Sequence, residues 1–200
     1  MSISEWQTLS ISSYLEKIPL WQLAATKRFD FEIMANGCSG HIPVTRLKSW
    51  QHFAMLLEHE FFNRPGVELV FRGHRQFDWN LTPTLGRISG TKGIVPERLT
   101  LAQLDRFKRA VRGRLKGNAV FVGNDPDELG ALGQHYGLRT PLLDWTQSPY
   151  VALFFAFCEE DSQDENDNPY RAVYVLKKSF LGEYREEMGI RLVEPRNAGA

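Results

Sequence analysis

Residues 134–157 read QHYGLRTPLLDWTQSPYVALFFAF, and the fold is predicted to form around this stretch. The pattern predicts two helices joined by a polar and aromatic connection of about eleven residues, a kind of loop on which scaffolds present binding or catalytic side chains. The first helix is expected to begin with Asp125 as N-cap and Pro126 at N1, and to end where Gly137 supplies a left-handed residue. Ser148-Pro149 opens the second helix in the same way.

The second helix is apolar on nearly every face from Val151 to Cys158, which predicts that it is buried rather than amphipathic. Strands are predicted at Val67–Arg72 and Arg171–Leu176. Apolar residues on both sides of the alternation place the first strand in the interior of a sheet. We therefore expect an α+β fold, in which helices flank a small central sheet and the Pro149–Glu159 helix packs beneath it.

Two further helices are predicted, one from Val44 to Phe62 and one beginning near Thr100. The second carries a basic face between Arg106 and Lys116. A face of this kind is usually solvated, but it also suits a phosphate backbone or an acidic partner, so a nucleic-acid or protein target stays open. These basic residues are Arg106, Lys108, Arg109, Arg112, Arg114 and Lys116.

The composition excludes several classes of protein. The 200 residues carry 24 basic and 24 acidic side chains, and this balance argues against a global electrostatic field for nucleic acid or membranes. No apolar run reaches the roughly 18 residues that a membrane span requires. Two distant cysteines, Cys38 and Cys158, fit a reduced cytoplasmic protein. His52 and His59 lie near one helical face without a third ligand, so no metal site is predicted.

Arg72 and Gly73 end the first predicted strand. A half-buried arginine costs several kcal/mol unless it pairs with a carboxylate or an anionic ligand. Gly73 lets the backbone turn or lets a ligand come close. Asp144 is the carboxylate expected either to pair with Arg72 in a purely structural ion pair or to face the same anion site.

Three features together resemble the FRG domain family, which is named for a Phe-Arg-Gly signature. The signature here is Phe71-Arg72-Gly73, followed by the aromatic and Pro-rich run 79–87 and by the block from Gln134 to Ala156. Arg139-Thr140-Pro141 stands where the family usually reads Pro-Thr-Arg. The resemblance implies an FRG domain over residues 44–200 after an N-terminal extension, residues 1–43. The family's last segment is not found before Ala200, which leads us to expect a missing C-terminal element.

The chain also has a looser resemblance to ADP-ribosyltransferases of the arginine–serine–glutamate type, because Arg72-Gly73 and the segment 144–156 are similar to two of their elements. This resemblance implies that Arg72 binds the pyrophosphate of NAD. It also implies that Tyr136 or Trp145 stacks on a ring of NAD and that Thr146 and Ser148 bond its ribose hydroxyls. The expected NAD-binding residues are Arg72, Gly73, Tyr136, Arg139, Thr140, Asp144, Trp145, Thr146 and Ser148. The catalytic candidates are Arg72, Asp144 and Glu187.

Two classes of function stay open. One is an NAD-binding enzyme that transfers ADP-ribose, as a toxin or a phage-defence effector would. The other is a non-catalytic module that recognises a nucleotide or nucleic acid in the same pocket. Glutamates 183, 186, 187 and 194 are the candidates for the catalytic carboxylate, and nothing in the sequence chooses among them. A Ser-His-Asp triad, a Walker loop and a metal cluster are not predicted.

Overall fold

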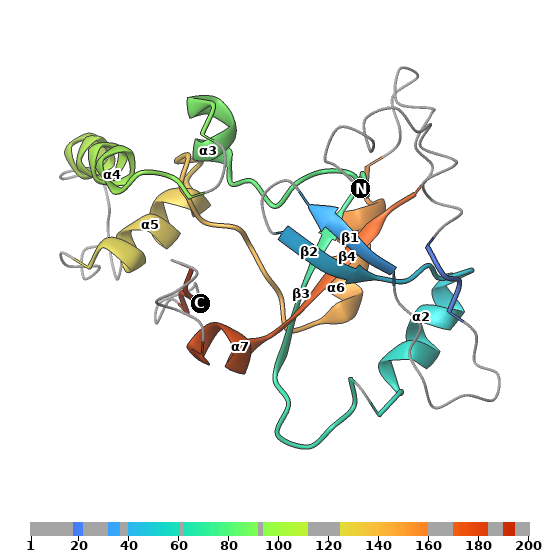
Figure 1. The fold of residues 1–200 in the computed structure, drawn as a ribbon. Helices are drawn as coiled ribbons and strands as arrows, with labels where there is room; N and C mark the ends of the chain where they lie inside the picture. The colour runs from blue at the N-terminus through green and yellow to red at the C-terminus, as the bar shows by residue number, and fades with distance from the viewer. Residues whose placement is uncertain are drawn as a thin grey trace. The chain divides into compact units, whose positions relative to one another are not determined.

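The computed structural model describes residues 18–21, 32–36, 40–60, 62–91, 94–111, 125–159, 170–183 and 190–194. The chain divides into two compact units (Figure 1). Unit 1 comprises residues 1–79 and 146–177, and unit 2 comprises residues 80–145 and 178–200. Among the helices of the described part, none has the length and apolar character that crossing a membrane requires.

An antiparallel pair of strands, β3 (Leu69–His74) and β4 (Ala172–Lys177), forms the centre of unit 1. Arg72 stands opposite Tyr174 in this ladder. On its other edge β3 makes a single bridge, in which Phe71 and Thr146 exchange two backbone hydrogen bonds of 2.7 and 2.9 Å. The two predicted strands and the α+β class are thus confirmed, and β3 has neighbours on both edges at Phe71.

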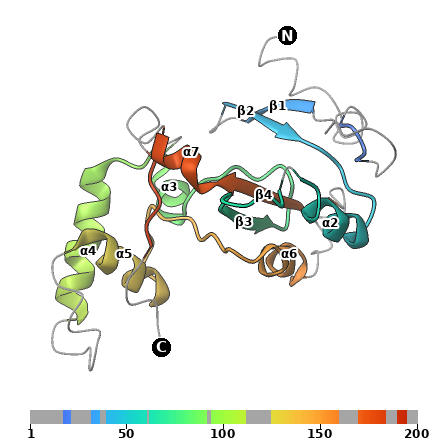
Figure 2. The same ribbon diagram turned by 90° about the horizontal axis from the view of Figure 1, so that it is seen from below.

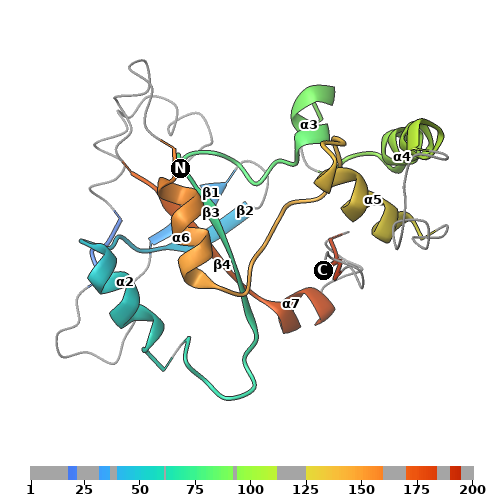
Figure 3. The same ribbon diagram turned by 180° about the vertical axis from the view of Figure 1, so that it is seen from behind.

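Helix α6 (Pro149–Phe157) packs against β3 and β4, as Figures 2 and 3 show from two directions. The packing side of the helix is made of small residues, since Ala152 and Ala156 are 1% and 0% exposed. The prediction that this helix is buried on nearly every face is wrong, because Phe154 and Phe155 are 63% and 60% exposed. The helix therefore contacts the strands through its alanines and points its large side chains away from them.

Both predicted ends of α5 and the predicted start of α6 are confirmed, whereas α6 ends at Phe157 and not at Glu159. Helix α5 (Pro126–His135) begins after Asp125, whose carboxylate accepts from the backbone N–H of Asp127. It ends before Gly137, which has a φ of 84°. In α6 the hydroxyl of Ser148 accepts from the N–H of Val151 at 3.4 Å.

Helix α2 (Trp50–Leu57) is shorter than the predicted span of residues 44–62. It begins only after Ser49, whose side chain accepts from the backbone N–H of His52. Residues before Ser49 cannot join the helix, because the backbone of Arg46 bonds to Pro19 and Trp21 at 2.8 Å each. The preceding strands, β1 (Glu32–Asn36) and β2 (Gly40–Val44), form a separate antiparallel pair.

Unit 2 is helical in the part described. It contains α3 (Thr84–Ser89), α4 (Glu97–Val111), α5 and α7 (Lys178–Glu183). Helix α4 begins three residues before the predicted Thr100, directly after Pro96. Its Leu104 and Phe107 pack with Leu129 of α5 in a buried cluster, so α4 and α5 share one apolar core.

Candidate functional site

Arg72 lies half-buried in β3, as the sequence predicted. Successive side chains of a strand point to opposite faces, so Arg72 and His74 share one face and Gly73 belongs to the other. Helix α6 covers the Gly73 face. Arg72 therefore lies on the face of the β3–β4 pair opposite α6, where Tyr174 is its neighbour across the ladder.

Arg72 and three neighbouring side chains form a group that we call the Arg72 cluster: Arg72, His74, Trp79 and Tyr174. The Nε–H of Arg72 donates to Nε2 of His74 at 3.1 Å. The His74 ring meets the rings of Tyr174 and Trp79 edge to face, with centroid distances of 5.0 and 6.2 Å. A cation and three aromatic rings from two strands and the following turn are thus held together.

The hydroxyl of Tyr174 donates to the carbonyl of Trp79 at 3.2 Å and ties β4 to the turn after β3. Burial raises the pKa of this phenol above its ordinary value, and the negative charge of Asp78 raises it further, whereas Arg72 opposes the change. Tyr174 therefore keeps its proton at neutral pH and acts as a donor. Trp79 is 45% exposed, so its indole also faces solvent.

Gly73 admits α6 to the strand. A Cβ on Gly73 would lie 1.9 Å from the carbonyl oxygen of Ala152 and 2.9 Å from the nitrogen of Ala156. The interpretation of Gly73 as a point of close approach is right, but the partner that approaches is the helix backbone. Its expected role in binding NAD stays a prediction.

The predicted ribose-binding hydroxyls of unit 1 already serve in the turn before α6. Thr146 is fixed by its backbone bridge to Phe71, and its hydroxyl accepts from the N–H of Ser148 at 3.1 Å. The hydroxyl of Ser148 caps the helix. Thr146 and Ser148 hold the start of α6 beside the strand that carries Arg72, and this is their observed function in the fold.

In unit 2 a second hydrogen-bonded group joins Gln134, Thr140 and Asp144. The side-chain amide of Gln134 donates to a carboxylate oxygen of Asp144, and its oxygen accepts from the hydroxyl of Thr140. Thr140 is 3% exposed, and its carbonyl accepts from the N–H of Leu85 at 3.2 Å. Gln134 was not among the expected site residues, although it is the residue that joins two of them.

The remaining predicted residues of unit 2 lie at the surface or partly buried. Tyr136 is 60% exposed at the end of α5, Arg139 is exposed, and Trp145 is partly buried. Arg72, Gly73, Thr146 and Ser148 belong to unit 1, whereas Asp144 and its neighbours belong to unit 2. The pairing of Arg72 with Asp144 therefore stays a prediction. Glu187 lies outside the described residues.

The predicted basic face is described only as far as Val111 in α4. Within that part Arg109 forms an ion pair with Asp105 at 2.7 Å, so one of the basic side chains has an acidic partner on the same helix. The residues 112–116 lie outside the described part. Their expected contact with a nucleic acid or protein stays a prediction.

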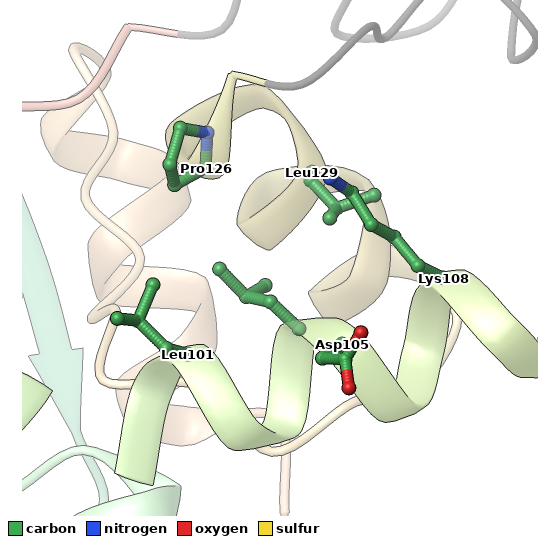
Figure 4. Close-up of a pocket in the computed structure, with 6 residues that line it drawn as sticks. Leu101, Asp105, Lys108, Pro126 and Leu129 are labelled. Carbon is green, nitrogen blue, oxygen red and sulfur yellow. The ribbon is translucent and has the colours of Figure 1, made fainter. Parts of the chain in front are cut away.

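A pocket of about 250 Å³ lies between α4 and α5 (Figure 4). Leucines from both helices line it, with Leu101 on α4 and Leu129 on α5, and Asp105 and Lys108 of α4 also line it. None of the residues that line it was expected to bind a ligand. Its lining consists of Leu101, Leu104, Asp105, Lys108, Pro126 and Leu129.

Among the residues that the structure describes, no group of three or more His, Cys, Asp or Glu side chains could hold a metal ion. Cys158, which was expected in a buried helix, is exposed at the end of α6. Cys158 is exposed for the same reason as Phe154 and Phe155, because only the alanine side of α6 packs against the strands.

Sequence reasoning missed three members of the Arg72 cluster. The predicted strand ended at Arg72, whereas β3 continues through His74. The spacing of Arg72 and His74 by two residues was the available signal, because it places both on one face of a strand. Tyr174 and Trp79 had no such signal, since their place depends on the pairing of β3 with β4.

Comparison with known proteins gives one match. Residues 67–165 match the model of a protein family, the FRG domain. The matched part begins just before β3 and runs past the end of α6. Neither a curated protein nor a solved structure matches the chain.

Proposed function

The chain belongs to the FRG domain family through residues 67–165, and we propose that this domain binds a nucleotide diphosphate such as NAD at the Arg72 cluster. The observation that carries the proposal is the contact of a half-buried guanidinium with His74, on the face of β3–β4 opposite α6 and beside Tyr174 and Trp79. Guanidinium groups bind phosphate through paired N–H donors, and indole or phenol rings stack on bases.

The reaction that fits the resemblance is ADP-ribosyl transfer. The bond between the nicotinamide nitrogen and C1′ of the ribose breaks, and nicotinamide leaves. A nucleophile of the target bonds to C1′ and gives its proton to a carboxylate. Glu187 and Asp144 are the candidates for that carboxylate. A toxin or phage-defence effector acting in the cytoplasm would use this chemistry, with its protein or nucleic-acid target at the basic face of residues 106–116.

Recognition without chemistry is the second candidate. The hydroxyls of Thr140, Thr146 and Ser148 all take part in hydrogen bonds that hold turns or a helix end. Side chains engaged in this way stabilise the scaffold whether or not a ligand is present. This observation favours a module that binds a nucleotide through Arg72 and the aromatic rings, with no turnover.

Calorimetry with NAD and with ADP-ribose tests the binding. Arg72→Ala should weaken it by roughly ten- to a hundredfold, because a charge-assisted contact to phosphate is lost. Arg64→Ala is the matched control, since Arg64 is an exposed arginine of the same unit in the turn before β3. The affinity of this variant for NAD and ADP-ribose should equal that of the wild-type protein. A folded wild-type protein that binds neither ligand at millimolar concentration refutes the proposal.

Release of nicotinamide separates the two candidates. The wild-type protein is incubated with NAD, and free nicotinamide is measured over time. Release that is lost in Arg72→Ala and in Glu187→Gln supports transfer chemistry. Binding of NAD with no release supports the recognition module.

A further inference from the structure

We propose that His74 is a positioning residue that orients Arg72 for the phosphate group of the ligand. The inference rests on the proposed function, and it assigns a role to a side chain that no motif singled out. Its starting point is the 3.1 Å hydrogen bond in which the Nε–H of Arg72 donates to Nε2 of His74. This bond fixes the plane of the guanidinium, and that plane decides where its other N–H groups point.

The direction of the bond defines the protonation of His74. A guanidinium only donates, so Nε2 of His74 must offer a lone pair. The imidazole is therefore neutral, and its single ring proton is on Nδ1. A doubly protonated imidazole has no acceptor and would place a second positive charge 3.1 Å from the guanidinium.

Burial and contacts with two aromatic rings hold the imidazole of His74 in one orientation, so the lone pair of Nε2 points in one direction. The side chain is 7% exposed. Tyr174 of β4 meets it edge to face at an interplanar angle of 65°, and Trp79 does so at 61°. The hydroxyl of Tyr174 also donates to the backbone carbonyl of Trp79, which ties the phenol to the turn that carries the indole.

The charged and titratable groups around His74 come from three segments. Arg72 lies on the same strand, Tyr174 on β4, and Asp78 acts on Tyr174 from the turn that leads to Trp79. The opposite face of β3 meets α6 through Gly73 and two alanines. Arg75 adds a positive charge 5.5 Å from the centroid of the Trp79 ring. Among these groups, Arg72 is the one that donates a hydrogen bond to Nε2 of His74.

Three substitutions at His74 separate orientation from packing. His74→Phe keeps the ring and removes the acceptor. His74→Gln places an amide oxygen near the position of Nε2, whereas His74→Asn reaches only the position of Nδ1. We expect the Phe and Asn variants to bind ADP-ribose roughly tenfold more weakly, because each loses one aligned hydrogen bond to a charged group. The Gln variant should bind with nearly normal affinity.

A readout without ligand keeps this test separate from the proposed function. In nitrogen-edited NMR spectra the Arg72 Nε–H signal, identified by its absence in Arg72→Lys, should be protected from exchange in the wild-type protein and in His74→Gln. It should broaden or exchange rapidly in His74→Phe. If the wild-type protein binds no ADP-ribose but shows this pattern, the proposed function fails while the contact between His74 and Arg72 stands.

Acidification provides a measurement that needs no variant. Histidine ordinarily gains a proton between about pH 5 and 8. As the pH is lowered, affinity for ADP-ribose should fall over the range in which the NMR signals of the imidazole nitrogens show that His74 gains a proton. In His74→Gln the affinity should not depend on pH in this range. A wild-type His74 protonated on Nε2 at neutral pH, or a Phe variant that keeps both the affinity and the Arg72 signal, overturns the proposal.

Discussion

Gly73 and Ala152 lie so close that a single added carbon would stand 1.9 Å from the helix carbonyl. This contact joins the Phe-Arg-Gly triplet to α6, the helix at the end of the block from Gln134 to Ala156. The glycine leaves room on one face of β3, and α6 fills that room with its alanines. Arg72 is thereby left to the other face.

The first prediction concerns this contact. Gly73→Ala should destabilise the fold by roughly 3 kcal/mol, because the clash is with backbone atoms that cannot move without displacing α6. Gly66→Ala is the matched control: Gly66 has a φ of 78° with nothing within 4 Å of an added Cβ. It should cost only about 1–2 kcal/mol from its left-handed backbone. Urea denaturation of both variants measures the difference, and equal costs would contradict the role given to Gly73.

The second prediction concerns the exposed side of α6. Phe154→Gln should change the free energy of unfolding by less than about 0.5 kcal/mol, because Phe154 is 63% exposed. Phe71→Ala should cost roughly 3–5 kcal/mol, because Phe71 is 4% exposed in β3. Thermal and chemical unfolding would measure both values. A large loss in Phe154→Gln would show that another surface covers α6.

The third prediction concerns the group of Gln134, Thr140 and Asp144. Gln134→Ala leaves the buried hydroxyl of Thr140 without its acceptor and should destabilise the protein by roughly 1–3 kcal/mol. In the background of Thr140→Val the same change should cost less, because the hydroxyl is already gone. Gln147→Ala, at an exposed position, serves as the control. Additive effects in the double variant would argue against a shared network.

The fourth prediction concerns pH and Tyr174. The folded state raises the pKa of this phenol, so above the ordinary tyrosine pKa of about 10 the unfolded chain loses its proton first. Tyr174 therefore makes its full contribution to the free energy of unfolding below the pKa of the unfolded chain. That contribution decreases as the pH rises from this pKa through the raised pKa of the folded state. The free energy of unfolding should decrease more steeply between about pH 9 and 11 in the wild-type protein than in Tyr174→Phe. Parallel curves for the two proteins would contradict this.

Local signals in the sequence were sufficient for both ends of α5 and for the start of α6. Asp125 and Ser148 each cap a helix through their own side chains, and Gly137 adopts the left-handed conformation that ends α5. These features depend on a few adjacent residues, so they are visible in the sequence. The positions of β3 and β4 were also predictable, because both are short apolar runs rich in β-branched or aromatic residues.

Contacts between distant segments could not be read in the same way. The apolar character of α6 predicted burial on all sides, but Gly73 selects Ala152 and Ala156 as the packing side. The helix predicted from Val44 begins at Trp50, because the backbone of Arg46 pairs with a segment near Pro19. Tyr174 joins the cluster only once the register of β3 and β4 is known.

The pairing of β3 with β4 has a consequence for how the chain folds. The two strands stand about a hundred residues apart in the sequence, and closing a loop of that length costs entropy before any contact repays it. Folding of the sheet is therefore expected to be slow compared with formation of the local helices. Until β4 arrives, the long edge of β3 stays available to other chains, so the nascent protein is most exposed to aggregation in that interval.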